Sequence, residues 1–341
     1  MIGVKTGIVF ICCLLFIACT SNNKHNLSID QLDFSYPDFW PQPTYTFKGN
    51  ALTHKRIALG KKLFFDKRLS SDSTISCESC HHQKKAFSDG EYKFSFGVNG
   101  KQSLRNTPAL FNLAWSKTFM WDGGVNHIEF QPIAPITNPL EMNESMEHVI
   151  HNIATSNEYQ LLFKEAYDTD SITSQLVLKA FAQFLGSLVS YDSKYDRIMR
   201  KYKEYSFIDE EAKGYVLFKK SCASCHTEPL FTNHAFENNG LSLAKVNPDY
   251  GRLLITKLAE DSMKFKVPSL RNLQFTAPYM HDGRFRTLSE VIDHYSSGIV
   301  NYPNKSHKLD YMPKFTRDEK QQLIAFLQTL DDPDFCLKPM R

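Results

Sequence analysis

Two short segments of the chain carry cysteine and histidine at a spacing that is typical of covalent haem attachment. Each has the pattern Cys-x-x-Cys-His, formed by Cys77, Cys80 and His81 in the first segment and by Cys222, Cys225 and His226 in the second. The thiols can hold the vinyl groups of a haem as thioethers, and the histidine can ligate the iron. A redox dithiol or a zinc site would need partner residues that this chain lacks. We therefore predict two covalently bound haem c groups.

The composition is that of a folded protein with room for two domains. The chain has 341 residues, of which 42% are hydrophobic and 23% are charged, and domains of about 150 residues are common. Phenylalanine is abundant, with 26 residues, as expected where apolar rings must enclose a flat macrocycle. The formal net charge of +3 is too balanced to favour nucleic-acid binding.

The first residues predict export from the cytoplasm. Lys5 precedes an apolar run, residues 7–18, that is short for a membrane span and matches a signal peptide. The run ends in Leu-Phe-Ile-Ala-Cys, which resembles the lipobox of bacterial lipoproteins, so we predict that Cys19 is lipidated. Because Phe16 replaces the usual leucine, an ordinary secretory peptide or an uncleaved anchor are the alternatives. Only Cys336 then remains without a role, which excludes a disulfide framework.

Apolar periodicity predicts helices that would position the two haem segments, and no strand pattern is convincing. The helices are expected over residues 52–66, 145–167, 172–189 and 212–220, with capping boxes at Thr287 and Thr316 starting the last two. Between the first segment and residue 144 the chain is irregular, and a loop of this length is uncommon unless it has a function, here enclosing a haem.

We therefore predict an all-α fold of two tandem c-type cytochrome domains, each enclosing one covalently attached haem. The expected parts are a signal peptide over residues 1–18, a tether and N-terminal arm over 19–50, an N-terminal domain over 51–200 and a C-terminal domain over 201–341.

Four further motifs accompany the haem segments. They are Lys-Lys-Leu-Phe-Phe-Asp at residues 61–66, Arg-Asn-Thr-Pro at 105–108, Trp-Asp-Gly at 121–123 and Thr-Ala-Pro-Tyr-Met-His-Asp-Gly at 276–283. With these motifs the chain resembles, from about residue 52 to residue 330, the bacterial di-haem cytochrome c peroxidases and their MauG-type relatives. The resemblance implies that the N-terminal haem reacts with peroxide and that the C-terminal haem passes electrons.

The resemblance also implies three catalytic residues, Trp121, Gln131 and Glu141, which keep the family's spacing of ten and ten. Glu141 would take a proton from the inner oxygen of bound peroxide and deliver it to the leaving oxygen. Gln131 would orient the oxygen ligand, and Trp121 would relay an electron between the haems. Taken singly, each of these residue types is more often structural.

A calcium ion between the domains is a further implication of the resemblance. Asn106, Thr276 and Pro278 match the positions of its protein ligands, and oxygen donors suit this hard cation. The alternative is a turn without a metal, because backbone carbonyls can come from any residue.

Two positions depart from the classical peroxidase pattern. Val98 stands where many relatives have a second histidine that closes the peroxidatic iron, so we predict an open sixth site on the N-terminal haem. Tyr295 stands fourteen residues after His281, where classical peroxidases have a methionine that ligates the C-terminal iron. A tyrosine ligand would lower the potential relative to a thioether. Met280 or Met312 is the alternative ligand.

Three functions remain open at this point. The first is a di-haem peroxidase that reduces hydrogen peroxide with electrons from a small cytochrome or cupredoxin. The second is a MauG-type oxidase that uses peroxide or oxygen to oxidise Tyr or Trp residues of a partner protein. The third, a pure electron carrier, is disfavoured by the retained Trp121, Gln131 and Glu141. We expect the protein to lie on the periplasmic side of the cell envelope and to contact the membrane only through a lipid anchor. A homodimer is compatible with the sequence.

Overall fold

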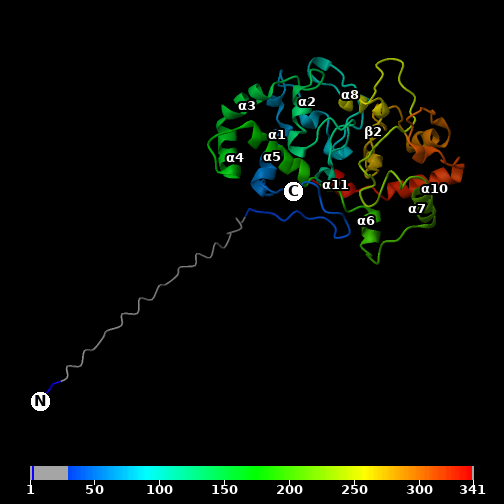
Figure 1. Cartoon of the computed structure of the whole chain (residues 1–341), viewed down its shortest axis with the longest axis horizontal. Coiled ribbons are helices and arrows are strands. Elements are labelled where there is room, and N and C mark those ends of the chain that lie inside the picture. Colours follow the sequence, from blue (N-terminus) through cyan, green and yellow to red (C-terminus); the bar gives the residue numbers. More distant parts are fainter. Residues whose placement is uncertain (1, 4–29, 340–341) are drawn as a thin grey trace.

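Two helical lobes lie side by side in the computed structural model, which describes residues 2–3 and 30–339 (Figure 1). The predicted signal peptide and Cys19 lie outside the described residues. Within the described ranges, no helix combines the length and the apolarity that crossing a bilayer requires. The first lobe contains α1 (His54–Phe65), α2 (Ile133–Thr137), α3 (Met146–Ala154), α4 (Asn157–Tyr167) and α5 (Ser174–Ser187).

The second lobe holds the remaining helices and a small sheet. Its helices are α6 (Lys194–Met199), α7 (Asp209–Ser221), α8 (Leu253–Thr256), α9 (Leu288–Asp293) and α10 (Arg317–Gln328), and α11 (Pro333–Leu337) follows them. Strands β1 (Phe236–Glu237) and β2 (Phe265–Lys266) pair antiparallel. Short 3₁₀ turns and irregular chain make up most of the rest, which confirms the all-α prediction with one two-stranded exception.

Close helix crossings define both lobes. In the first lobe, Gly60 of α1 lies against α5, and a Cβ on this residue would overlap the carbonyl oxygen of Ala180. In the second lobe, Gly214 of α7 lies against α10, where a Cβ would overlap the carbonyl oxygen of Gln322. Because both glycines precede a haem segment, each crossing fixes the direction in which the chain enters that segment.

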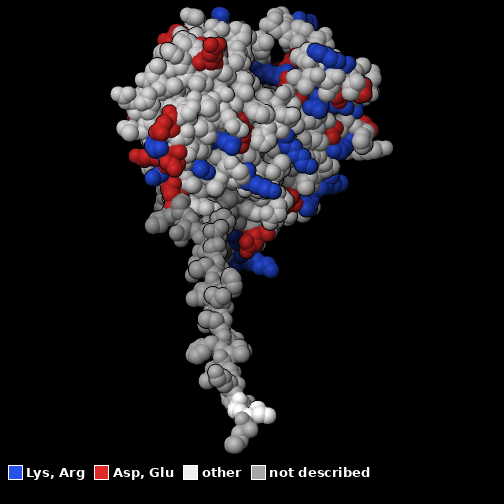
Figure 2. Space-filling view, turned by 60° about the vertical axis from the view of Figure 1, so that its left-hand side comes forward, with Lys and Arg blue, Asp and Glu red and all other residues white. Residues whose placement is uncertain are grey.

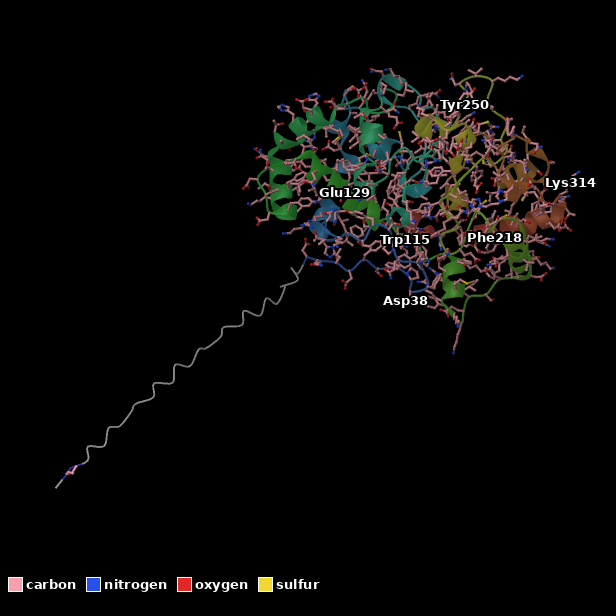
Figure 3. All side chains as sticks on the ribbon, viewed as in Figure 1. Asp38, Trp115, Glu129, Phe218, Tyr250 and Lys314 are labelled. Atoms are coloured by element: carbon pink, nitrogen blue, oxygen red, sulfur yellow. The ribbon has the colours of Figure 1, made fainter. Side chains whose placement is uncertain are left out.

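Apolar side chains fill the space around both crossings. Leu59, Leu63, Phe64, Phe181 and Phe184 are almost fully buried in the first lobe, and Phe218, Phe231, Leu323 and Phe326 are buried in the second. Burying each such side chain contributes about 1.5–3 kcal/mol. Figure 3 marks Phe218 inside the second lobe.

Two of the predicted helix boundaries are wrong. The helix expected over residues 145–167 is two helices, α3 and α4, because Thr155 and Ser156 interrupt it and Ser156 becomes the N-cap of α4. The capping boxes at Thr287 and Thr316 do begin α9 and α10, but α10 is not the last helix. Asp332 caps α11 through Phe335 N at 3.1 Å, with Pro333 in the first turn.

The two lobes exchange elements at their boundary. Helix α6 lies before residue 200, yet Asp196 forms a fully buried ion pair with Arg271 of the second lobe at 2.7 Å. Helix α11 returns to the first lobe, where the Phe335 ring lies 5.8 Å from the Phe87 ring. By these contacts α6 belongs to the second lobe, whereas α11, at the end of the chain, packs on the first lobe.

The N-terminal arm, residues 30–50, crosses both lobes. Gln31 forms an antiparallel bridge with Thr53 at the start of α1. Further on, the buried Trp40 ring packs on Trp115, with ring centroids 5.0 Å apart, and the Arg271 guanidinium lies 4.7 Å from the Trp40 ring. Trp115 is labelled where the arm meets the lobes in Figure 3. The arm therefore links the two lobes through a buried side chain, Trp40, although most of its residues are exposed or half-buried.

Charged side chains of both signs are distributed over the face that Figure 2 presents. This distribution agrees with the balanced composition and with the absence of nucleic-acid signals in the sequence.

Candidate haem sites and active site

The first haem segment follows α1 and a short 3₁₀ turn, and its histidine is held in one orientation. His81 Nδ1 lies 2.6 Å from the carbonyl oxygen of Phe87 and donates its proton to it. This bond leaves the Nε2 lone pair for a metal. Burial lowers the pKa of His81 to about 4, so the imidazole is neutral, which is the form that ligates iron.

The second segment repeats this arrangement at the end of α7. His226 Nδ1 lies 3.1 Å from the carbonyl oxygens of both Phe231 and Pro268. Burial lowers the pKa of this histidine to about 4 as well. Both histidines therefore present a fixed, neutral Nε2, although the two segments are 145 residues apart.

A cavity of about 330 Å³ opens beside the second segment. Cys222, Cys225 and His226 line one side of it, and apolar walls come from residues such as Leu270, Ile292 and Leu327. Two thiols, an oriented imidazole and apolar walls are the donor set and surface that a covalently held haem requires. The residues present therefore fit this group.

Glu141 lies at the first haem segment. Its Oε1 accepts a 2.7 Å hydrogen bond from Asn138 Nδ2, and burial raises the pKa of its carboxyl above the ordinary range. Burial is also the main cause that raises the pKa of the Cys77 and Cys80 thiols to about 12, and the charge of Glu141 adds to both shifts. The Glu141 carboxyl therefore lies near the two attachment cysteines.

Val98 is adjacent to the backbone of Glu141. The side chain of Val98 is fully buried, and its backbone N–H donates to the carbonyl oxygen of Glu141 at 2.8 Å. Gly97 allows this approach, because a Cβ there would overlap the carbonyl oxygens of Leu140 and Glu141. The structure thus brings together Val98 and Glu141, which the sequence singled out separately.

Trp121 and Gln131 lie on the wall of the cavity beside the second haem segment, and Glu141 does not. This cavity extends between the lobes. The indole Nε1 of Trp121 donates to the carbonyl oxygen of Asn106 at 2.8 Å. Its own carbonyl oxygen accepts from Lys266 N at 2.7 Å. Residues of both lobes therefore hold Trp121 between the two haem segments.

The three candidate ligands of the second haem iron, Tyr295, Met280 and Met312, all line the same cavity. Tyr295 comes from a π-helical turn, His294–Gly298, that continues α9. Burial raises the pKa of its phenol to about 12. Asn239 Nδ2 lies 3.5 Å from the Tyr295 hydroxyl and 3.7 Å from the Met280 sulfur.

The predicted calcium ligands all line the cavity between the lobes. They are Asn106, Thr276 and Pro278, and Asn106 Nδ2 donates to the carbonyl oxygen of Lys93 at 3.2 Å. This bond turns the amide oxygen of Asn106 away from Lys93. Within the described part of the chain, no cluster of three or more His, Cys, Asp or Glu side chains could hold a metal. A cation here would depend on amide and carbonyl oxygens, and calcium stays a prediction.

An internal repeat relates the two lobes at the site. Phe119-Met120-Trp121-Asp122-Gly123 and Tyr279-Met280-His281-Asp282-Gly283 are offset by 160 residues. Phe119 bridges Val125, as Tyr279 bridges Phe285, and Met120 and Met280 both have positive φ, 65° and 75°. His281 thus takes in the second lobe the position of Trp121, and it stacks on Phe265 at 3.6 Å.

Several residues at the site were missed by the sequence reasoning. Asn138 stands three positions before Glu141, a spacing at which two side chains on a turn can hydrogen-bond, so its contact with Glu141 could have been predicted from the sequence. Lys266 left no such signal, although its Nζ is buried beside Trp121 and donates to the carbonyl oxygen of Thr118 at 2.7 Å. Burial lowers the pKa of this lysine to about 8. Its partners are about 150 residues away, so no local pattern reveals it.

Comparison with known proteins gives consistent matches over both lobes. Residues 54–204 match the family model described as di-haem cytochrome c peroxidase, and residues 211–331 match the cytochrome c model. These matches confirm the prediction of two c-type haem domains.

Individual relatives match over nearly the whole chain. The methylamine utilization protein MauG of Methylorubrum extorquens is 37% identical, over 92% of this chain and 87% of that protein. Cytochrome c551 peroxidase of Nitrosomonas europaea is 34% identical, over 82% and 81%. Among solved structures, a MauG-like protein associated with microbial copper homeostasis is 31% identical, with a TM-score of 0.80 over 90% of this chain and 98% of that chain.

Proposed function

Because the chain belongs to the family of di-haem cytochrome c peroxidases and MauG proteins, we propose that it reduces hydrogen peroxide to water. The reaction takes up two electrons and two protons for each peroxide, and a small cytochrome or cupredoxin supplies the electrons. The observation that carries the proposal is the half-buried carboxyl of Glu141, a residue at the first haem segment whose backbone contacts Val98, which cannot ligate iron.

The haem held by Cys77, Cys80 and His81 supplies the iron that binds and reduces peroxide. Residues of the chain transfer the protons of the reaction and hold the reacting groups in place. Glu141 accepts a proton from the inner peroxide oxygen and returns it to the outer one, and Asn138 holds the carboxyl through Oε1. His81, which the Phe87 carbonyl orients through Nδ1, would hold the iron of this haem through Nε2. The family spacing assigns Gln131 the orientation of the oxygen ligand, although Gln131 lines the cavity of the second segment, which Glu141 does not line. Trp121 relays electrons from the second haem, which Cys222, Cys225 and His226 hold.

Replacing Glu141 by glutamine tests the proton role. E141Q keeps the shape and the hydrogen bond from Asn138 but removes the titrating group, so we expect peroxide cleavage to fall by at least about 100-fold. The measurement is single-turnover mixing of the haem-loaded protein with peroxide. The matched control is E147Q, which changes an exposed glutamate on α3. Near-normal cleavage by E141Q would refute the role of Glu141.

The open sixth site is tested by electron paramagnetic resonance of the oxidised protein. With Val98 in the loop, the first haem should give a high-spin ferric signal without prior reduction. V98H should convert this signal to a low-spin one, because imidazole can then close the iron. A native protein that shows low-spin signals alone would contradict the open site.

A MauG-type oxidase is the second candidate, favoured by Val98 and by Tyr295. Such an enzyme would oxidise Tyr or Trp residues of a partner protein with the same peroxide chemistry at the first haem. The two candidates differ in turnover. Rapid steady-state consumption of peroxide with a reduced small cytochrome supports the peroxidase. Slow consumption, with an oxidised state that lasts until a protein substrate is added, supports the oxidase.

The remaining proposals concern the cation, the location and the assembly. We propose calcium at Asn106, Thr276 and Pro278, export to the periplasmic side, and attachment to a membrane by lipid on Cys19. Metabolic labelling with a fatty acid should mark the native protein and leave C19A unlabelled. Sedimentation of the haem-loaded protein decides whether it is a homodimer.

A further inference from the structure

Asn239 lies between the two groups that could complete the coordination of the second haem. Its Nδ2 is 3.5 Å from the hydroxyl oxygen of Tyr295 and 3.7 Å from the sulfur of Met280. All three residues line the cavity that also contains His226, Cys222 and Cys225. One amide group therefore lies at hydrogen-bonding range of both competing ligands on the wall of this cavity.

The position of this amide is fixed by the backbone around it. Asn239 Oδ1 accepts from Leu241 N at 3.4 Å, which directs the NH₂ group toward Tyr295 and Met280. The next residue, Gly240, has a φ of +70° and lies so close to Ile299 that a Cβ would collide with its side chain. Val300 N donates to the carbonyl oxygen of Gly240 at 2.8 Å. The backbone of Asn239 is therefore fixed, and rotation of its amide would cost the hydrogen bond from Leu241 N.

Asn239 is also tied to the helix that presents the tyrosine. The carbonyl oxygen of Asn239 accepts from His294 Nε2 at 3.0 Å, and His294 directly precedes Tyr295 in the π-helical turn His294–Gly298. Single π-helical turns change the direction of the side chains they carry and are frequent at functional sites. Asn239 thus contacts His294 through its backbone carbonyl and Tyr295 through its side-chain amide.

We propose that Asn239 is the positioning residue that selects Tyr295 over Met280 as the sixth ligand of the second haem. The inference rests on the proposed function, since it assumes that both segments carry haem. A hydrogen bond from an amide to a charged oxygen is stronger than one to a thioether sulfur. The Asn239 amide therefore stabilises the Tyr295 oxygen as a ligand more than it stabilises the Met280 sulfur.

The consequence is control of the potential of the second haem. A hydrogen bond to a charged group is strong enough to shift an equilibrium between two ligands by about tenfold or more. Tyrosinate favours ferric iron, whereas a methionine ligand raises the potential. Asn239, which binds neither iron nor peroxide, would keep the potential of the second haem low.

The test uses N239L in the haem-loaded protein, because leucine has nearly the size of asparagine and no donor. We expect the ferric spectrum and paramagnetic resonance signal of the tyrosinate-ligated haem to decrease, with a histidine–methionine signal in its place and a higher midpoint potential. N239L combined with M280L should restore the tyrosinate signal and the low potential. M280L alone should resemble the native protein. N239A provides a second variant if N239L folds poorly.

Three outcomes overturn the inference. One is a native spectrum and potential in both N239L and N239A. Another is failure of M280L to restore the signal in the double variant. The third is an unchanged second-haem spectrum in Y295F, because Tyr295 would then not be the ligand. None of these bears on peroxide cleavage at the first haem, which the E141Q measurement decides separately.

Discussion

At the haem sites, burial shifts the pKa of single side chains and so sets their protonation state. His81 and His226 are both neutral because burial lowers the pKa of each to about 4. Glu141 responds in the opposite direction, since burial raises the pKa of a carboxyl. If its ionised form is the base, peroxide cleavage should decline as the pH falls through this raised pKa, and the decline should begin at a higher pH than for an exposed glutamate.

Asp331 gives a prediction about stability at the same scale. Burial raises its pKa to about 7, and its Oδ2 is buried without a hydrogen-bond partner among the described residues. The folded state therefore holds the proton more tightly than the unfolded state does. The stabilisation is complete below the unfolded pKa near 4 and is lost as the pH rises through about 7.

We expect D331N to raise the melting temperature at pH 8 and to change it little at pH 4. The asparagine Oδ1 can still accept from Gln274 N, which donates to Asp331 Oδ1 at 3.2 Å. Thermal unfolding of both proteins across this range is the measurement. An equal effect of D331N at both pH values would contradict the assigned cause.

At the scale of elements, the closest helix crossings determine how the chain reaches each haem segment. Gly60 and Gly214 are the residues that allow α1 to touch α5 and α7 to touch α10. Helix α11 adds a contact just after the first haem segment. Gln83 Nε2 donates to the carbonyl oxygens of Phe335 and Lys338 at 3.1 and 2.7 Å, next to the Phe87 carbonyl that orients His81.

G214A should destabilise the second lobe strongly. The new Cβ would meet the backbone carbonyl of Gln322, which cannot move without breaking α10, and overpacking of this kind costs about 1–3 kcal/mol or more. Chemical denaturation monitored at the second haem is the measurement. K213A, an exposed neighbour on α7, is the control and should cost less than about 0.5 kcal/mol. Equal stability of G214A and the native protein would show that the helices can separate freely.

At the scale of the molecule, polar contacts join the lobes around Trp121. Arg105 of the first lobe pairs with Asp249 of the second, with Nε and Oδ2 2.6 Å apart, and also with Asp122. Asn106 N donates to the carbonyl oxygen of His281 at 2.8 Å. The proposed calcium would add a cation at the same seam, so electron relay through Trp121 depends on how firmly the lobes are joined.

Removal of calcium is the prediction at this scale. Chelation by EGTA should lower the melting temperature and slow electron transfer between the haems, and added calcium should restore both. Elemental analysis of the purified protein, with N106A as the variant of reduced affinity, checks that the cation is the cause. A protein that contains no calcium and does not respond to EGTA would rule out the site.

Much of the architecture could be predicted because its determinants are local. The haem segments, the helices around them and the caps at Thr287 and Thr316 each depend on residues a few positions apart, so the sequence displays them directly. The missed break at Thr155 is also local, and polar residues at the end of α3 could have shown it. The role of Trp121, Gln131 and Glu141 came from family spacing, and it remains a proposal.

The sequence by itself determined which chemistry the chain can carry: two covalent haems, an acid–base candidate and an all-α frame. Only the tertiary structure decided which of these residues meet. It brought Glu141 to Val98, turned Asn239 toward both Tyr295 and Met280, buried Lys266 beside Trp121 and returned α11 to the first lobe. The reason is physical, since attachment and capping use neighbours in the chain. The burial and the orientation of these side chains depend on residues that are far apart in the chain, from 41 positions for Asn239 and Met280 to 148 for Lys266 and Thr118, and such contacts leave no periodic pattern in the sequence.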